Sequence, residues 1–502
     1  MTDLRLVPAA VTAWAVTAAG ILWALAGVLA ALAGAIAVTV AAGWWAGSRR
    51  AGGTDRRALL GAVTAVALVG GGFGVAVCLR VDEVRDHPVS IYAGSATAVV
   101  VTPDEAPRVL AGGRVMFRAT LARLDGLPSS GSVLVFASGA DYAGLQAGRP
   151  AGFRAHVRPP SRRDLTVAVL SATGRPHFGE AALMHRAAHH VRSEFADAVR
   201  LVLPAGQAAL LPALVLGDTS AVPPEVTREF RVAGLTHLTA VSGANVTIVC
   251  GAVLLTAALI GPRAAVVLAA LTLAGFVVVV QPSASVLRAA VMGAITLLAV
   301  LTHRRRQALP ALAAAVVVLM IGAPELAVDV GFALSVSATA GLVLVAPVWS
   351  RRLTGRGWPR PLADAVSVAL AAQLVTAPLV AGVSGSVSLV SVAANLLVAP
   401  VIPPITVVGT AAAALGPLWP AGAQLLIRFT GPEVWWLTAV SGWAAAMPAA
   451  SVPVPSGLAG VGIVAAVAVL VALVWHWACG VGRCRAGVTP SSGEHRSAPH
   501  PR

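Results

Sequence analysis

Residues 264–280 read AAVVLAALTLAGFVVVV, a run without a single charged side chain. Its length approaches the roughly 20 residues that an α-helix needs to cross a bilayer. Similar apolar runs recur along the chain, in which 57% of the 502 residues are hydrophobic and only 11% are charged. Soluble globular domains carry about twice that share of charged residues. The sequence therefore predicts an α-helical polytopic membrane protein.

Blocks of arginine between the apolar runs predict how the chain crosses the membrane. They lie at 49–57, 304–306 and 351–360, and a fourth lies in the tail 479–502. Because cytoplasmic loops carry an excess of basic residues, we expect all four blocks, and so the C-terminus, in the cytoplasm. About 11–12 transmembrane helices satisfy this arrangement: two within 7–48, one over 58–79, and the others over 234–260, 264–280, 285–302, 308–322, 331–350, 362–382, 387–413, 424–446 and 458–477.

Residues 81–178 interrupt the helical pattern with short β-type runs that turn-rich segments separate. Five short strands at this spacing predict a small β-barrel of the OB type. Because the preceding span ends outside, we expect this inserted domain to be extracytoplasmic. The expected strands are 95–102, 114–121, 132–138, 152–158 and 165–170.

One expected strand of this domain, FRAHVR at 153–158, alternates apolar and basic residues. Alternate side chains of a strand project from opposite faces, so the basic ones share the outer face. The domain holds eleven Arg against eight Asp and Glu, a net charge of +3 that the positive-inside rule does not explain outside the membrane. A groove that follows a phosphate backbone explains it, and a solvated strand face is the alternative. The predicted DNA-binding residues are Arg154, His156, Arg158, Arg162 and Arg163.

Residues 180–203 predict an amphipathic helix that lies on the outer membrane surface. Arg192 is expected on its polar side, together with His185 and His189. These two histidines lie four residues apart, but no third metal ligand is visible. The four cysteines show no spacing typical of a metal site or a disulfide framework. We therefore expect neither a metal nor a cofactor.

Polar residues concentrate in GLTHLTAVSGANVTI, residues 234–248. On a helix, Thr239, Ser242 and Asn245 share one broad face, which lipid cannot satisfy. Other expected spans hold Ser335, Gln373, Ser391 and Asn395, and one holds Arg288, for which a position near the helix end would allow its charge to reach the surface. Almost no carboxylate is expected within the spans, which disfavours a proton-coupled pump. Hydrogen bonding between helices is one explanation of this pattern, and a polar-lined conduit is the other.

Four segments, taken in order, resemble the ComEC family of competence proteins. They are ALVLGDTSAVPPEVTREFRVAGLTHLTAVSGANV (213–246), PSASVLRAAVM (282–292), VGFALSVSATAGLVL (330–344) and AQLVTAPLVAGVSGSVSLVSVAANLLVAPVI (372–402), and 85–178 takes the place of the family's OB-like domain. The resemblance implies transport of single-stranded DNA across the cytoplasmic membrane during natural transformation. With the other polar residues of the spans, the expected signature or channel-lining set is Asp218, Gly234, His237, Thr239, Ser242, Gly243, Asn245, Arg288, Ser335, Gln373, Ser391 and Asn395.

Two departures from the family pattern change what the resemblance implies. Asn245 stands where the family usually has histidine, so hydrogen bonding is expected there but protonation is not. The sequence shows no His-x-His-x-Asp-His cluster of the metallo-β-lactamase-like domain that many members carry. We therefore expect no catalytic residue and no nuclease activity.

The expected function is that of a channel component for DNA uptake, in the bacterial cytoplasmic membrane. A transporter of small solutes or lipid-linked substrates is the alternative, and an enzyme is disfavoured because no nucleophile–base pair is visible. The expected partners are single-stranded DNA, the lipid bilayer, a separate DNA receptor, a nuclease and a cytosolic ATP-driven helicase or translocase, with a homo-oligomer left open. The expected domains are N-terminal transmembrane helices (1–80), the OB-like domain (81–178), membrane-surface helices (179–233), a competence-type channel domain (234–478) and a basic cytoplasmic tail (479–502).

Overall fold

The structure is a computed structural model of the chain. The arginines expected at 49–50 and 304–306 and the tail beyond 484 lie outside the described residues. The described residues are 4–23, 25–34, 36, 54–110, 112–139, 141–142, 144–281, 283–302 and 307–484.

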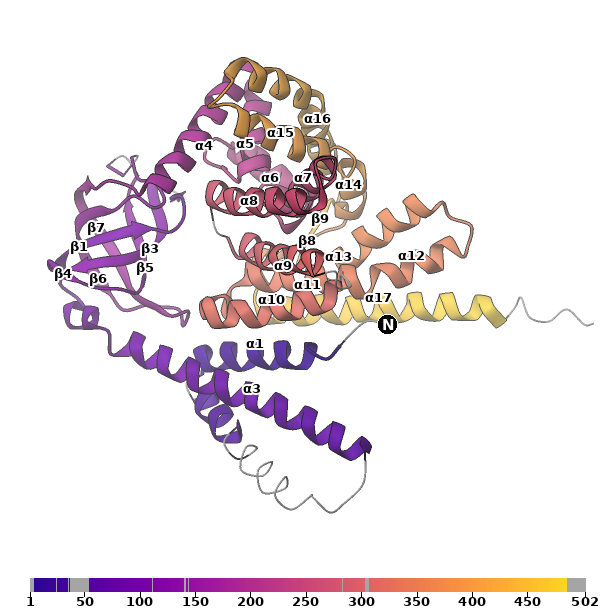
Figure 1. Cartoon of the computed structure of the whole chain (residues 1–502), viewed down its shortest axis with the longest axis horizontal. Coiled ribbons are helices and arrows are strands. Elements are labelled where there is room, and N and C mark those ends of the chain that lie inside the picture. Colours follow the sequence, from indigo (N-terminus) through magenta and orange to yellow (C-terminus); the bar gives the residue numbers. More distant parts are fainter. Residues whose placement is uncertain are drawn as a thin grey trace, which may run out of the picture.

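The first helices pair and lead the chain into the barrel. Helix α1 (Val7–Leu22) packs against α3 (Thr54–Arg85). At 1.5 Å per residue, the 32 residues of α3 span about 48 Å, which exceeds the ~30 Å hydrocarbon core of a bilayer. The helix therefore continues past the expected span 58–79, and Figure 1 shows it running from the helical part to the barrel.

Five long strands close into a barrel, which confirms the expected OB-like domain. The chain of neighbours runs β1–β3–β5–β7–β6 and back to β1, with β5 and β7 parallel and the other pairs antiparallel. Apolar residues at every second position fill the interior, where Phe117, Leu121 and Leu170 are fully buried. The strands are β1 (Ala96–Pro103), β3 (Arg114–Leu124), β5 (Ser132–Ser138), β6 (Ala151–Arg158) and β7 (Thr166–Phe178), and the short β2 (Arg108–Val109) and β4 (Leu127–Pro128) pair with β3.

The remaining described chain is helical apart from one short antiparallel pair of strands that lie far apart in the sequence, and most of its helices pack around two hydrophobic cores. One core joins α4–α9 with α14–α16, and the other joins α1, α3, α10 and α11. The helices are α4 (Leu183–Val202), α5 (Ala205–Leu216), α6 (Pro224–Val232), α7 (Gly243–Ala257), α8 (Pro262–Val280), α9 (Ala284–Leu301), α10 (Ala308–Gly322), α11 (Val330–Leu344), α12 (Ala346–Thr354), α13 (Arg360–Ser384), α14 (Ser391–Val398), α15 (Ile402–Leu415), α16 (Pro420–Ala446) and α17 (Leu458–Cys484).

Within the described residues, five helices are long and apolar enough to cross a membrane. A bent pair, α14 and α15, adds a sixth if the pair counts as one span. Shorter apolar helices, among them α7 and α10, must be counted to reach the expected 11–12. The fold is thus that of a multi-pass helical membrane protein with an inserted barrel.

Two expected helices differ from the structure. The expected span 387–413 begins instead with β8 (Ser386–Ser388), which pairs with β9 (Ser451–Pro453), and α14 and α15 then meet at a 54° bend. Prolines at the start of α15 explain the bend, because they lack the N–H groups that would continue the helix of α14.

The expected helix 234–260 starts only at Gly243. Before it, Gly234 has a left-handed backbone with φ of +72°, a single 3₁₀ turn spans Thr236–Leu238, and Ser242 is extended. Thr239 and Ser242 therefore precede the helix, and the shared helical face expected for them with Asn245 is wrong.

The barrel lies at one end of the long helices. Figure 1 shows it beyond the ends of α1 and α10, with α3 reaching under it, whereas α12 and the end of α17 lie at the opposite end. Helix α12 carries two of the expected cytoplasmic arginines, Arg351 and Arg352. The barrel and this basic helix thus mark opposite ends of the helical part.

Candidate functional site

A buried arginine on α4 holds together the helix ends next to the barrel. Arg192 is only 8% exposed, and its Nη1 donates to the carbonyl oxygens of Leu216 and Val279, each at 3.1 Å. These carbonyls belong to the last turns of α5 and α8, where no intrahelical donor is available and the helix dipole is negative. Arg192 therefore caps two helices at once.

The sequence predicts Arg192 on the exposed, polar side of an amphipathic helix. The structure corrects this expectation, because the side chain is buried. Helix α4 packs against α5, α8, α15 and α16, so these helices cover part of its polar side as well. Burial lowers the pKa of the guanidinium, and the carboxylate of Asp218 opposes this shift. The distance from Nη2 to Asp218 Oδ2 is 3.8 Å.

Asp218 lies in a tight turn that follows α5. Gly217 ends α5 with a φ of +72°, and Asp218 Oδ1 accepts hydrogen bonds from the backbone N–H and the hydroxyl group of Ser220 at 3.1 and 2.6 Å. The turn fixes the carboxylate beside Arg192. The signature aspartate therefore anchors the junction between α4 and α5.

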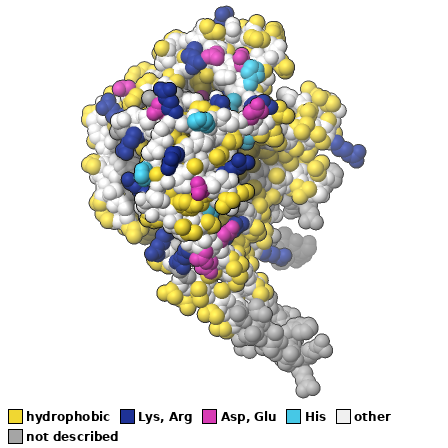
Figure 2. All heavy atoms as spheres, turned by 90° about the vertical axis from the view of Figure 1, so that its left-hand side faces the viewer, with side chains coloured by type: hydrophobic (Ala, Val, Ile, Leu, Met, Phe, Trp, Pro, Cys, Tyr) yellow, Lys and Arg dark blue, Asp and Glu magenta, His cyan; other side chains and the backbone are white. Residues whose placement is uncertain are grey.

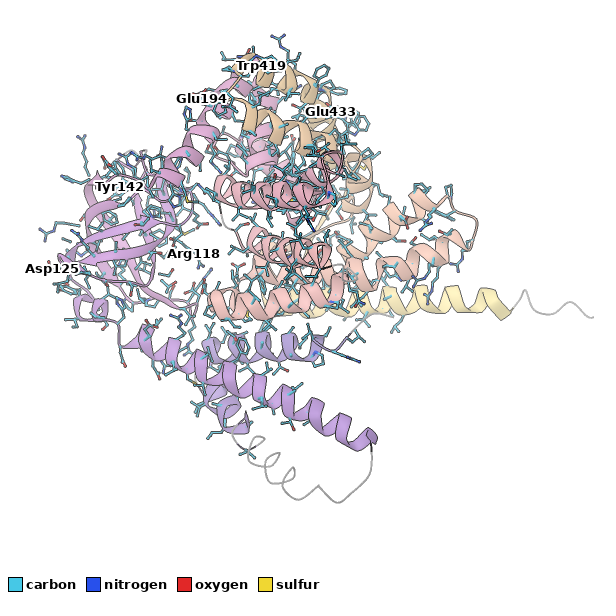
Figure 3. All side chains as sticks on the ribbon, viewed as in Figure 1. Arg118, Asp125, Tyr142, Glu194, Trp419 and Glu433 are labelled. Carbon is cyan, nitrogen blue, oxygen red and sulfur yellow. The ribbon has the colours of Figure 1, made fainter. Side chains whose placement is uncertain are left out.

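A cleft of about 850 Å³ separates this junction from the barrel. Its size is that of sites that hold small molecules or nucleotides. Figure 3 labels Tyr142 on the barrel, and this residue lines the cleft opposite α4. Its hydroxyl group is enclosed and has no hydrogen-bond partner among the described residues, and burial raises its pKa to about 12. The polar and charged lining residues are Tyr142, Gln146, His189, His190, Arg192, Ser193, Arg200, Asp218, Ser220 and Gln281.

His189 joins α4 to the barrel within this cleft. Its Nε2 lies 3.1 Å from the carbonyl oxygen of Ala147. Burial lowers the pKa of His189 below its ordinary value of 6.5, because the enclosed site disfavours the charged imidazolium. The folded protein therefore favours the neutral imidazole.

This depressed pKa predicts a pH-dependent stability. At a pH between the lowered pKa of His189 in the folded protein and its ordinary value of 6.5 in the unfolded chain, the unfolded chain binds more protons. The contribution of His189 to the free energy of unfolding is therefore complete above pH 6.5 and falls as the pH drops below it. Replacing His189 by glutamine is expected to flatten this part of the profile of thermal unfolding midpoint against pH. The neighbouring His190, which is exposed, provides the matched control: His190→Gln should retain the acid-side loss. An equal flattening in both variants would contradict the assignment.

The loop before α7 packs directly against α14. A Cβ atom on Gly234 would lie 2.4 Å from Cβ of Ser391, so only glycine fits at this contact. Around it, Gln373 Nε2 donates to the carbonyl oxygen of Ser388 at 3.4 Å, and Asn395 Nδ2 donates to that of Ser391 at 2.8 Å. Signature positions from two separate segments, 213–246 and 372–402, thus meet at one place.

Asn245 connects α7 to α5. It is 6% exposed, and its Nδ2 donates to the carbonyl oxygen of Leu214 at 3.1 Å. Ser242 donates from its hydroxyl group to Asn245 Oδ1 at 3.4 Å. The amide therefore satisfies another carbonyl in the last turn of α5, next to the one that Arg192 caps.

Arg288 connects α9 to α11 and to the start of α7. Its Nε donates to Ser335 Oγ at 2.7 Å, and its Nη1 lies 3.1 Å from the sulfur of Met292. Gly243 lies against the guanidinium, since a Cβ there would be 2.4 Å from Nη2. Arg288 is 7% exposed, so the alternative that it reaches outward to the surface is wrong.

Two signature residues stay apart from these contacts. Thr239 donates only to the carbonyl oxygen of Thr236, within its own turn. His237 lies in the single 3₁₀ turn Thr236–Leu238 and is exposed. The roles of these residues in transport remain predictions.

The alternation expected along β6 is confirmed: Arg154, His156 and Arg158 are exposed and the residues between them are buried. Figure 2 shows basic side chains spread over this side of the molecule. A hollow of about 560 Å³ on the barrel places Arg154 beside Arg123 and Arg175. Sequence reasoning missed these last two, because only the pairing of β1 with β3 and β6, and of β6 with β7, brings Arg123 of β3 and Arg175 of β7 near Arg154.

The loop between β6 and β7 uses one of its two expected DNA-binding arginines for another contact. Arg163 Nη1 donates to the carbonyl oxygen of Leu22, at the end of α1, at 2.6 Å. The next residue, Asp164, pairs with Arg118 of β3 at 3.4 Å. Arg162 is exposed in the same loop. Binding of DNA by the barrel residues remains a prediction.

Sequence reasoning also missed an acidic residue within the helices. Glu433 lies in the middle of α16, inside the expected span 424–446, and its Oε2 is enclosed without a hydrogen-bond partner among the described residues. Figure 3 labels it on this helix. The expectation of almost no carboxylate within the spans therefore has an exception in Glu433.

The fold and these contacts define the class: a multi-pass helical membrane protein that carries an OB-like barrel. Residues 214–479 match the family described as Competence protein, and this match covers more than half of the chain. The chain belongs to this family, as its resemblance to ComEC proteins indicates.

One relative makes this membership concrete. Over 201 residues the chain is 28% identical to ComE operon protein 3 of Bacillus subtilis (strain 168), which covers 40% of the chain and 25% of that relative. The chain thus matches about a quarter of the relative's length. No solved structure matches the chain. The family match begins at residue 214, after the barrel and α4.

Proposed function

We propose that this chain is a channel component that carries single-stranded DNA across the cytoplasmic membrane during natural transformation. Membership of the competence protein family supports a role in DNA uptake. The observation that carries the proposal is a continuous series of contacts between the barrel-side cleft and the signature residues.

This series starts at Arg192, which lines the cleft and caps α5. In the same turn of α5, Leu214 accepts a hydrogen bond from Asn245 of α7. Two residues earlier, Gly243 lies against Arg288 of α9. In this proposal a strand received at the barrel follows this series into the helical part, where neutral hydroxyl and amide groups outnumber charged ones and bind phosphates weakly enough for conduction.

The arrangement of the two ends supports an extracytoplasmic barrel. The barrel and the basic helix α12 lie at opposite ends of the long helices, and the positive-inside rule assigns the basic end to the cytoplasm. Exposed Arg154, Arg158 and Arg162 then face incoming DNA. A separate receptor, a nuclease and a cytosolic ATP-driven helicase or translocase complete the proposed system.

The alternative class is a transporter of small solutes or lipid-linked substrates. Binding of single-stranded DNA to basic side chains releases counterions, so affinity falls steeply as salt rises. A solute transporter shows no such oligonucleotide binding. The basic hollow on the barrel favours the DNA channel over this alternative.

Uptake of labelled donor DNA into a competent host tests the proposal. A strain that lacks the gene is expected to bind DNA at its surface but to admit none to the cytoplasm, and the wild-type gene should restore entry. Electroporated plasmid controls for general fitness. The double variant Asn245→Ala with Asn395→Ala is expected to lower entry strongly, because it removes two amide groups near the proposed route. Normal entry without the gene would overturn the proposal.

A further inference from the structure

Among the described residues, the charge of Arg288 has no partner of opposite sign. No ion pair among the described residues includes it, and its hydrogen bonds go to a hydroxyl group and a thioether. A buried charge without an acidic partner is costly, and inside membrane helices such residues are usually functional. The surroundings of Arg288 therefore call for an explanation beyond packing.

The start of α7 adds further positive potential at the same place. Ser242 precedes the helix but its side chain makes no capping hydrogen bond, and the N–H groups of Gly243 and Ala244 have no acceptor among the described residues. Free N–H groups and the helix dipole make such an end attractive to anions. Arg288 itself lies in the second turn of α9, near another positive helix end.

The close contact at Gly243 brings these positive groups together. Nη2 of Arg288 lies where a side chain on residue 243 would begin, so the guanidinium abuts the first turn of α7. Nη2 makes none of the side chain's hydrogen bonds, and it is not among the fully enclosed unpartnered polar atoms of the described chain. A water-sized group can therefore reach it. Two positive features held in contact favour an anion beside them.

We infer that Arg288 and the first turn of α7 form a phosphate-binding site. The inference rests on the proposed function, in which the phosphate belongs to the transported strand. Guanidinium groups and helix N-termini are both established phosphate ligands. The shared chemistry is that of a phosphate group, which a DNA strand, a lipid headgroup or free phosphate can supply.

Fluorescence anisotropy of a labelled oligo-thymidine with the purified full chain in nanodiscs tests the site. Arg288→Gln is expected to bind about 10-fold or more weakly, because it loses a charge-assisted hydrogen bond. The slope of log affinity against log salt is expected to fall by about 0.7, the value for one phosphate contact on a single strand. Arg288→Lys should keep most of the slope. The exposed Arg263, at the start of α8, supplies the control Arg263→Gln, which should leave both values unchanged.

The outcomes separate the sources of phosphate and the two proposals. One outcome is that only inorganic phosphate, or nanodiscs of phosphatidylglycerol, raise the unfolding temperature in an Arg288-dependent way. The DNA strand is then not the ligand of this site, and the inference that the site binds a phosphate of the transported strand is overturned. Unchanged oligonucleotide binding and unchanged phosphate response in folded Arg288→Gln would remove the site but leave the proposed function standing. A wild-type protein that binds no oligonucleotide would instead count against the proposed function. Gly243→Ala, which places a methyl group against Nη2, gives a second variant if Arg288→Gln fails to fold.

Discussion

Replacing Gly234 by alanine is expected to abolish DNA uptake and to destabilise the protein by about 2–5 kcal/mol. The estimate adds the cost of about 1–2 kcal/mol for a left-handed backbone with a side chain to the cost of about 1–3 kcal/mol for overpacking. Both apply, because Gly234 has a φ of +72° and the new Cβ would lie 2.4 Å from Cβ of Ser391. The measurements are entry of donor DNA and the thermal unfolding midpoint of the purified chain.

Two companion variants make this result specific. Gly251→Ala places a methyl group in open space on α7, so uptake should remain as in the wild type and stability should not fall. Combining Gly234→Ala with Ser391→Gly removes the clash but keeps the backbone strain, so about half of the lost stability should return. If Gly234→Ala behaves like Gly251→Ala, the contact between the loop and α14 is not as described.

The second large effect is expected at Arg192. Arg192→Leu leaves the carbonyl groups of Leu216 and Val279 and the carboxylate of Asp218 without their partner. Removal of one partner from a buried charged network costs about 3–5 kcal/mol. We expect a large drop in the thermal unfolding midpoint and loss of the cleft geometry, with loss of DNA entry as a consequence.

The same helix provides the control for Arg192. Arg200 is exposed and pairs with Asp197 on the surface of α4, so Arg200→Leu should cost no more than about 1 kcal/mol. Arg192→Lys should lie between the two, because a single ammonium group cannot reproduce the forked contacts of the guanidinium. Similar midpoints for Arg192→Leu and Arg200→Leu would show that the buried network contributes little.

Sequence periodicity predicted the strands and helices that depend only on the pattern of neighbouring residues. The five strands of the barrel lie where alternation placed them, and β6 exposes Arg154, His156 and Arg158 as expected. Helices α8 and α10 follow apolar runs that need no partner to specify a helix in lipid. These features depend on neighbours a few residues apart, so they can be read from the chain directly.

Other features had a local signal that was misread or overlooked. The prolines after α14 mark the bend that a single span 387–413 ignored. Glycines at 234 and 243 are a local signal for a break, and the structure interrupts there the continuous helix expected over 234–260. Glu433 was visible as an acid in an apolar run, and the structure shows it enclosed in α16.

By itself, the sequence determined that the chain is a multi-pass membrane protein with a five-stranded barrel and a set of polar signature residues. Only the tertiary structure decided how these residues meet. Arg288 reaches Ser335 across 47 positions, and Arg192 reaches Val279 across 87. The physical reason is that Arg192 and Arg200 lie on the same amphipathic helix, in the same local sequence pattern, although one is buried and the other exposed. Only the free carbonyl groups at the ends of distant helices distinguish Arg192 from Arg200.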